Sequence, residues 1–341
     1  MSERKFKISD ELLGSGRYTD VYVAYDQSDN KPTKTKYAAK ALPDDLSNED
    51  ELNYFTKEIL VSTEFTNPNL VKFYGITEYD NTFYLIYEYC NGGDLNKYLK
   101  SYIEKFGESI GEKEVQKIIK DILNGLSCLH RNLVIHHDIK PGNILLQYKT
   151  EKDKNDLNID NCTFKLADFG LSKYTNEAKT DKIYGTYTFI DPICSIYNRL
   201  ELFDEDKTDI WAIGILTYRL LFKNTHPFIS NEIYKRNYNQ QMLNSNLRNN
   251  ILKGIYYVKI NEKQISKEVL AFLDSCLKLN QVIRKSSEDL EYSWFLTRNY
   301  NKFSFIDLDN FEDSIPNEYR GKTEIILNIQ NENFIEDEFN L

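Results

Sequence analysis

Short stretches of alternating apolar and polar residues occupy positions 6–41, and Gly, Asn and Pro residues interrupt them. This alternation, bounded by turn residues, is typical of antiparallel strands. The next segment, 50–65 (DELNYFTKEILVSTEF), spaces its apolar residues three and four apart, which predicts a helix that Ser47 or Asn48 can cap. Strands return after this helix around a turn at Asp80–Asn81. The first part of the chain therefore predicts an antiparallel sheet with one main helix.

Helical periodicity dominates the rest of the chain. Residues 112–130 (EKEVQKIIKDILNGLSCLH) gather their apolar side chains on one helical face. Residues 210–222 (IWAIGILTYRLLF) are too few to span a bilayer and include Arg219, so we expect a buried helix there. The polar residues 147–162 separate two apolar runs and predict an enlarged hairpin loop. A strand-rich first part thus precedes a mainly helical remainder.

Composition and charge narrow the class of protein. The 341 residues are 41% hydrophobic and 13% aromatic, which favours an ordered chain with a large core. A net charge of -10 argues against a nucleic-acid or anionic-membrane partner, because phosphate groups require a basic surface. The five Cys residues have no metal or redox spacing, and the N-terminus has no apolar signal region. We therefore expect reduced thiols in an intracellular, cytoplasmic protein, with a nuclear location not excluded.

Two motifs in the first part carry polar groups that suit phosphate binding. In LGSGRYTDVYVA, Gly14 and Gly16 leave room for a phosphate beside a strand turn, while Thr19 takes the place of a third Gly. A hairpin turn without a ligand would fit the same pattern. Lys40 ends the apolar YAAK stretch, and Glu58 lies on the following helix. An ion pair that faces phosphate oxygens and a solvated surface Lys are both compatible with this spacing.

The segments VIHHDIKPGN and KLADFG carry the most specific chemistry. Asp138 can accept a hydroxyl proton and orient a nucleophile, and Lys140 can hold a transferred phosphate. Asn143 and Asp168 offer neutral and anionic oxygen ligands that suit Mg²⁺. Each short motif alone would also fit an ordinary polar loop.

In this order the motifs resemble those of the eukaryotic protein kinase family, serine/threonine type, over residues 8–298. The segments NPNLVKFYGI, YEYCNGGDL, GTYTFIDP and DIWAIGILTYRLL extend the resemblance. It implies an α+β, bilobal protein-kinase-like fold. We expect a small antiparallel-sheet lobe with one main helix over 1–89, a larger mainly helical lobe over 90–298, and an acidic and apolar extension over 299–341.

The resemblance also implies an activity and its residues. It predicts transfer of the ATP γ-phosphate to a Ser or Thr hydroxyl of a protein substrate, with ATP and Mg²⁺ as cofactors. The catalytic residues would be Asp138 as the base, Lys140, Asn143 and Thr186, and the metal ligands would be Asn143 and Asp168. Tyr87 falls at the gatekeeper position. The ATP-binding residues would be Leu13, Gly14, Gly16, Val21, Ala38, Lys40, Glu58, Glu88, Cys90, Asp94, Leu145 and Asp168.

The resemblance further implies structural roles. Phe169 and His136 are expected to stack in an internal spine, and Asp209 is expected to hydrogen-bond the catalytic-loop backbone. His130 and His226 have no partner at ligand spacing, so we expect them to pack or cap.

One departure from the family pattern concerns regulation. His137 replaces the Arg that pairs with a phosphate on the activation loop in phosphorylation-switched relatives. A mostly neutral imidazole cannot supply the bidentate fork of a guanidinium group. We therefore predict activity with little dependence on activation-loop phosphorylation, although Thr175, Thr180 and Tyr184 remain candidate modification sites.

Two further departures concern stability and coupling. Ile193 stands where the family has a Glu that pairs with a later Arg, here Arg284. Because an unpaired buried Arg is costly, we expect Glu201 or another acid to replace the partner. Ser62 occupies a usually apolar spine position, and a polar residue there is expected to weaken the coupling of the first helix to the active state.

Two rival functions remain to be weighed. A nucleotide-binding pseudokinase that acts as a signalling scaffold would share the fold, but every residue required for transfer is present. A small-molecule phosphotransferase is disfavoured because the full activation segment suits an extended protein substrate. The tail from Asn299 contains two amphipathic segments that either pack on the large lobe or act as an autoinhibitory or partner-binding element.

Overall fold

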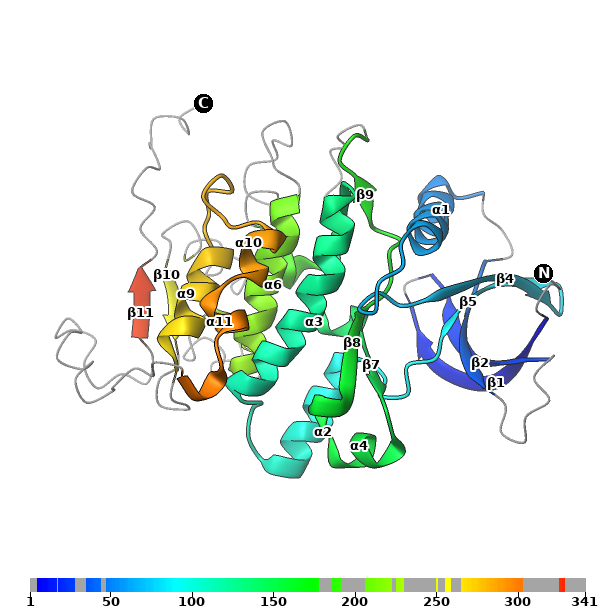
Figure 1. Cartoon of the computed structure of the whole chain (residues 1–341). Coiled ribbons are helices and arrows are strands. Elements are labelled where there is room, and N and C mark those ends of the chain that lie inside the picture. The colour runs from blue at the N-terminus through cyan, green and yellow to red at the C-terminus, as the bar shows by residue number, and fades with distance from the viewer. Residues whose placement is uncertain are drawn as a thin grey trace. The chain divides into compact units, whose positions relative to one another are not determined.

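The computed structural model describes a defined part of the chain: residues 5–16, 18–27, 35–43, 47–177, 186–191, 206–222, 225–229, 250, 255–258, 265–302 and 325–328 (Figure 1). Two compact units are present, one made of residues 1–101 and 124–174 and the other of residues 102–123 and 175–341. The predicted catalytic loop and the predicted metal ligands fall in the same unit as the N-terminal strands. The lobe boundary near residue 89 stays a prediction.

A five-stranded antiparallel sheet begins the first unit. The strand order is β1-β2-β3-β5-β4, and every neighbouring pair is antiparallel. The strands predicted from the alternating pattern, before and after the first helix, are confirmed. Their bounds are β1 Phe6–Ser15, β2 Asp20–Asp26, β3 Lys36–Ala41, β4 Phe73–Tyr79 and β5 Thr82–Glu88.

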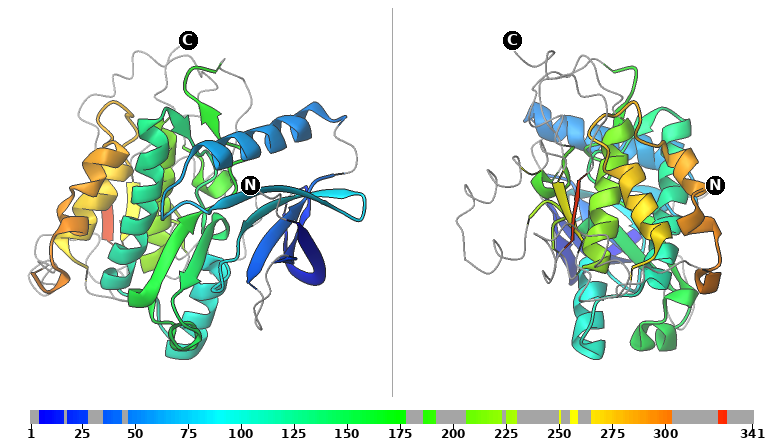
Figure 2. Two further views of the ribbon diagram at one scale, coloured as in Figure 1. Left: turned by 45° about the vertical axis from the view of Figure 1, so that its right-hand side comes forward. Right: turned by 90° about the vertical axis from the view of Figure 1, so that its left-hand side faces the viewer.

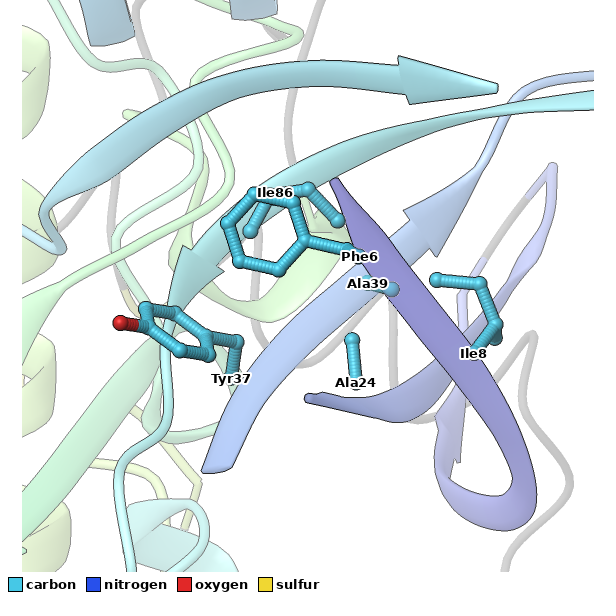
Figure 3. Close-up of a cluster of buried hydrophobic side chains, with 6 residues drawn as sticks. All are labelled: Phe6, Ile8, Ala24, Tyr37, Ala39 and Ile86. Atoms are coloured by element: carbon cyan, nitrogen blue, oxygen red, sulfur yellow. The ribbon is translucent and has the colours of Figure 1, made fainter. Parts of the chain in front are cut away.

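Each face of this sheet carries a cluster of buried side chains. One face carries a cluster in which the rings of Phe6 and Tyr37 meet edge to face at 5.0 Å, together with Ile8, Ala24, Ala39 and Ile86 (Figure 3). Because successive residues of a strand point to opposite faces, Ala39 faces this cluster and Lys40 faces the other side. The sheet therefore directs Lys40 towards the helix that follows β3.

That helix, α1 (Glu49–Glu64), lies alongside β4 and β5 (Figure 1, Figure 2). The Asn48 side chain accepts a hydrogen bond from the backbone N–H of Asp50 at 2.9 Å, which confirms the predicted cap. The buried residues of α1 are Tyr54, Phe55, Glu58, Val61 and Ser62, which share one helical face. Glu58 thus faces the interior, although it is acidic.

Turn chemistry fixes the hairpin between β4 and β5. Asp80 and Asn81 have φ values of 52° and 60°, as a two-residue type I′ turn requires. Asp and Asn tolerate this left-handed conformation better than other residues with side chains. The turn predicted at this dipeptide is confirmed.

The catalytic-loop region of the first unit consists of short elements. Strands β7 (Ile144–Tyr148) and β8 (Cys162–Leu166) form the predicted antiparallel hairpin. Its loop contains a short helix, α4 (Glu151–Asp156), which Thr150 caps and which the polar pattern did not predict. The remaining elements are β6 (Val134–Ile135), η1 (Pro141–Asn143), η2 (Ile159–Asn161) and β9 (Lys173–Tyr174), with β6 paired to β9.

Helices dominate the described parts of the second unit. In α6 (Asp206–Leu221) twelve of sixteen residues are buried, which confirms the predicted buried helix. Helices α2 (Leu95–Phe106) and α3 (Glu112–Arg131) run from one unit into the other, and α3 confirms the amphipathic helix predicted there. The remaining elements are η3 (Tyr187–Phe189), β10 (Ile255–Val258), α9 (Lys267–Cys276), α10 (Ser287–Glu291), α11 (Trp294–Thr297), η5 (Tyr300–Lys302) and β11 (Ile325–Asn328).

Strand β11 belongs to the C-terminal extension and pairs antiparallel with β10. The rest of the extension beyond residue 302 lies outside the described residues. Within the described residues, no helix has both the length and the apolar character that crossing a membrane requires.

Arg284 in the second unit is buried, and all three of its guanidinium nitrogens donate hydrogen bonds. Its guanidinium pairs with the buried carboxylate of Asp191 and donates to the carbonyl groups of Lys207 and Lys278. Gln281 donates a further hydrogen bond of 2.8 Å to the same carboxylate. Asp191 is therefore the acid that pairs with Arg284, whereas Ile193 and Glu201 lie outside the described residues.

Candidate active site

A cavity of about 540 Å³ lies within the first unit. All twelve residues expected to contact ATP, from Leu13 in β1 to Asp168 after β8, line this cavity. Asn143 and the predicted gatekeeper Tyr87 also line it. The structure therefore brings these residues together from the sheet, α1, the segment after β5 and the catalytic loop.

Lys40 lies at the centre of an ion cluster at the cavity wall. Its Nζ atom is 3.0 Å from Oδ1 of Asp168 and 3.6 Å from Oε1 of Glu58. Lys40 and Glu58 are 9% and 2% exposed, so solvent screens this cluster weakly. The surface-Lys alternative is therefore wrong, and the predicted Lys40–Glu58 pair is present.

Electrostatics keeps Lys40 and Asp168 ionised, whereas burial raises the pKa of Glu58 above its usual value. Burial alone would lower the pKa of the Lys40 ammonium, but the carboxylates of Glu58 and Asp168 outweigh burial and hold this pKa well above its usual value. Burial alone would raise the pKa of Asp168, but the Lys40 charge and a hydrogen bond from Tyr54 lower it below its usual value. Asp168 is thus an anionic oxygen donor at neutral pH.

Three predicted residues of the catalytic loop bond to one another. The Asn143 amide donates to the carboxylate of Asp138 at 2.8 Å and to its backbone carbonyl at 2.9 Å. Lys140 Nζ is 2.5 Å from Oδ2 of Asp138. Because Asn143 uses its amide nitrogen for these bonds, its amide oxygen is the atom available to a cation.

The backbone brings the two predicted metal ligands next to each other. Pro141 begins the η1 turn that ends at Asn143, and the N–H of Ala167 donates to the Asn143 carbonyl at 2.9 Å. Asp168 follows immediately with a φ of 68°. This left-handed conformation turns the chain out of β8 after its last buried residue, and Asp tolerates it.

The phosphate-loop motif closes on itself at one of its glycines. The N–H of Gly16 donates to the carbonyl of Thr19 at 2.7 Å, and a Cβ on Gly16 would lie 3.0 Å from that carbonyl oxygen. At Gly14, an added Cβ would meet no described atom within 4 Å apart from those of its two chain neighbours. The described residues therefore leave open space beside Gly14, which is compatible with a ligand approaching there.

The segment that follows β5 also lines the cavity. Gly92 lies so close to β7 that a Cβ there would be 2.6 Å from the Cβ of Leu146. The Asp94 carboxylate accepts from the backbone N–H of Lys97 at 3.1 Å, and thereby caps α2 as well as lining the cavity.

Burial raises the pKa of the Cys90 thiol to about 12, so this thiol is a packing group and not a nucleophile. The backbone groups of Glu88 and Cys90 remain the predicted adenine contacts.

Tyr87 connects the gatekeeper position to α1. Its hydroxyl donates to Oε1 of Glu58 at 2.8 Å, and it lies 3.5 Å from Oγ of Ser62. Ser62 thus gives a polar neighbour to a buried hydroxyl, at the position where an apolar residue was expected. The effect of Ser62 on coupling stays a prediction.

Tyr54 is a cavity residue that the sequence reasoning missed. It lies one turn before Glu58 on the buried face of α1, and its hydroxyl contacts both Lys40 and Asp168. Burial raises the pKa of its phenol, so the hydroxyl keeps its proton and donates to Asp168. The available signal was its spacing: residues four apart on a helix lie on the same face.

The structure describes the contacts of some of the other predicted residues but not of all of them. The rings of His136 and Phe169 are both buried and lie 5.5 Å apart, tilted by 60° and not stacked; their place in an internal spine stays a prediction. Thr186 and Asp209 belong to the second unit, and their roles towards the catalytic loop stay predictions. Thr180 and Tyr184 lie outside the described residues.

The donor set fits a magnesium–ATP complex. Within the described residues, no group of three or more His, Cys, Asp or Glu side chains is arranged to hold a metal ion alone. Mg²⁺ bound with nucleotide needs only one or two protein oxygens, since phosphates and water complete its shell. Asp168 and Asn143 line the cavity and offer such oxygens. The cavity also has an apolar part at Val21, Ala38 and Leu145 that suits a purine ring.

Comparison with known proteins identifies similar sequences. Residues 8–295 match the protein kinase domain family. The chain is 28% identical over 306 residues to human serine/threonine-protein kinase tousled-like 2, covering 85% of this chain and 36% of that protein. It is 29% identical over 280 residues to human tousled-like 1, covering 78% and 33%, respectively. It is 27% identical over 312 residues to calcium-dependent protein kinase 4 of Plasmodium berghei, covering 90% and 52%.

The chain spans 40% or less of the length of the tousled-like relatives. The family match nevertheless covers most of this chain, including the sheet, the catalytic loop and α6. It also coincides with the site geometry found here, in which Lys40, Glu58 and Asp168 form one ion cluster. The chain belongs to the protein kinase family.

Proposed function

We propose that this chain is a protein serine/threonine kinase that transfers the γ-phosphate of ATP to a Ser or Thr hydroxyl of a protein substrate. The observation that carries this proposal is the ion cluster at the cavity wall, with Lys40 Nζ 3.0 Å from Asp168. A second support is the hydrogen-bonded group formed by Asp138, Lys140 and Asn143. The names of the tousled-like relatives support the same reaction class.

Each residue has a defined part in the proposed reaction. Lys40 binds the α- and β-phosphates, and Glu58 holds Lys40 in position. Asn143 and Asp168 hold Mg²⁺, which when bound neutralises charge on the phosphate oxygens. Asp138 orients the substrate hydroxyl and accepts its proton, while Lys140 binds the transferred phosphoryl group.

Regulation and substrate binding are also part of the proposal. His137 cannot form a bidentate pair with a phosphate, so activity depends little on phosphorylation of the activation loop. Thr186 contributes to acceptor choice. The C-terminal extension docks on its own chain, and the antiparallel pairing of β11 with β10 supports this docking.

The test is phosphoryl transfer from Mg²⁺-ATP to the chain itself and to a generic basic protein. The purified chain is expected to label Ser and Thr residues, while Asp138→Asn loses at least about a hundredfold in rate because it removes the base. ATP binding by both proteins is measured in parallel. Two silent proteins that still bind ATP would instead favour a nucleotide-binding pseudokinase scaffold.

Dependence on phosphorylation is tested separately. Phosphatase-treated and untreated protein are compared at matched concentrations after the phosphatase has been removed. Equal initial rates are expected, and a large loss of activity on treatment would contradict the role given to His137.

A further inference from the structure

Tyr54 connects two charged residues of the site through its hydroxyl. The Tyr54 oxygen accepts a hydrogen bond from Lys40 Nζ at 3.0 Å and donates to Oδ1 of Asp168. Lys40 Nζ also bonds the same Oδ1 atom at 3.0 Å. One oxygen of the predicted metal ligand is therefore held by two donors, and its other oxygen, Oδ2, is the one available to a cation.

The Tyr54 ring is fixed by the residues around it. Gly170 lies against the ring so closely that a Cβ there would be 2.2 Å from the nearest ring carbon. On another side, the ring of Tyr18, from the phosphate-loop motif, meets the Tyr54 ring edge to face with centroids 4.9 Å apart. Tyr54 is only 7% exposed. A single side chain of α1 thus contacts both the phosphate loop and the segment that carries Asp168.

We propose that Tyr54 is a positioning residue that fixes the carboxylate of Asp168 for the cation bound with ATP and holds the phosphate loop through Tyr18. Rotation of the carboxylate about its Cβ–Cγ bond would break the bond from Tyr54 as well as the bond from Lys40, so the second donor on Oδ1 restricts that rotation further. This inference rests on the proposed function, since it assigns Asp168 to a metal. It deepens that function by naming how the site is held.

Two variants of Tyr54 separate its hydroxyl from its ring. Tyr54→Phe removes the hydroxyl bonds to Asp168 and Lys40 and keeps the ring contacts with Tyr18 and Gly170, whereas Tyr54→Leu removes both the bonds and the ring contacts. Tyr98→Phe is the matched control, because Tyr98 is a buried Tyr of the same unit whose ring meets Phe164 edge to face and is not part of the cavity lining. All three variants are made in the full chain and checked by circular dichroism.

The first measurement is binding of a non-hydrolysable ATP analogue, with Mg²⁺ and with EDTA. For Tyr54→Phe we expect unchanged binding in EDTA, and a rise of roughly tenfold in the Mg²⁺ concentration needed for half-maximal tight binding, the size of effect usual for one hydrogen bond to a charged group. In turnover, the same variant is expected to lose kcat while KM for ATP changes little at saturating Mg²⁺. Tyr98→Phe is expected to match the wild type in both assays.

The second measurement is hydrogen exchange of the chain without nucleotide or metal. Tyr54→Leu is expected to speed exchange of the phosphate loop around Tyr18, while Tyr54→Phe leaves that loop protected. Unchanged Mg²⁺ dependence in Tyr54→Phe would overturn the inference while leaving the kinase activity of the wild type in place. Tighter Mg²⁺ binding by that variant would overturn it too, because Tyr54 would then compete with the cation. A wild type without Mg²⁺-dependent nucleotide binding would contradict the proposed function, and with it this inference.

Discussion

Individual hydroxyl groups hydrogen-bond to the charged residues of this site. Two Tyr side chains, Tyr54 and Tyr87, supply hydrogen bonds to Asp168 and Glu58, respectively. A buried carboxylate needs such donors as well as an opposite charge, because one ion pair does not satisfy all of its lone pairs. The gatekeeper Tyr87 is therefore as much a part of the ion cluster as a wall of the cavity.

This role of Tyr87 predicts an order of stability among variants. Tyr87→Phe removes the donor to Glu58 and is expected to lower the free energy of unfolding by about 1.5–3 kcal/mol, as for other hydrogen bonds to charged groups. Ser62→Ala removes only the long 3.5 Å contact with the Tyr87 hydroxyl, and its expected cost is below about 1 kcal/mol. Urea unfolding at neutral pH measures both. A larger cost for Ser62→Ala than for Tyr87→Phe would show that the cluster is held differently.

Among single residues, the sequence predicted some contacts of the site and missed others. The spacing of Lys40 and Glu58 left a surface Lys open, and the family resemblance predicted that the two residues meet at the ATP site; that pair is present. The acid that bonds Arg284 was not predicted by number, since Asp191 occupies a position two residues before the expected one. A guanidinium group reaches several carbonyls and carboxylates at once, so a shift of two residues in its acidic partner leaves no trace in periodicity or composition.

At the scale of elements, the sequence predicted those that depend on periodicity and caps. The strands, α1 with its Asn48 cap, α3 and α6 all follow from apolar spacing or from end residues. Helix α4 was not predicted, because its six residues have no apolar face. Thr150 caps this helix and Leu157 ends it with a φ of 55°, so local backbone bonding and not burial determines it.

The cap of α1 gives a prediction at this scale. Asn48 satisfies two backbone N–H groups at the start of the helix, which also has Glu49, Asp50 and Glu51 in its first turn. Asn48→Ala is expected to lower the free energy of unfolding by about 0.5–2 kcal/mol, whereas Asn48→Asp keeps the cap and is expected to cost less than about 0.5 kcal/mol. Urea unfolding of the three proteins measures this. Equal losses in both variants would mean that the side-chain cap contributes nothing.

For the molecule as a whole, the sequence predicted the family and the residues of the site, and the structure showed which of these residues contact one another. All twelve residues expected around ATP line one cavity. The pairing of β10 with β11 joins segments about seventy residues apart, and no local pattern specifies such a pairing because strand partners depend on tertiary packing. The sequence therefore predicts which residues meet a ligand better than which segments meet each other.

The pH dependence of overall stability has a defined contribution from His226. Its ring is buried and makes two bonds that suit the neutral form: Nε2 lies 3.2 Å from the Thr188 carbonyl, and Nδ1 accepts from the Phe228 N–H at 3.3 Å. Burial lowers the pKa of His226 from 6.5 to about 3. Unfolded His226 thus binds a proton below pH 6.5, whereas the folded ring does not. The stability of the folded state is fully present above that pH and is lost as pH falls towards 3.

Comparison of the wild type with His226→Gln isolates this contribution, because other titrating groups act in both proteins. Between pH 7.5 and 5.8, the wild type is expected to lose about 1 kcal/mol more unfolding free energy than the variant, as a single proton taken up only by the unfolded chain requires. The range stays above the isoelectric point near 5.1, where the chain would lose solubility. Urea unfolding at several pH values in this range gives the difference. Parallel pH curves for the two proteins would mean that His226 titrates alike in the folded and unfolded states, and that its two ring bonds do not keep it neutral.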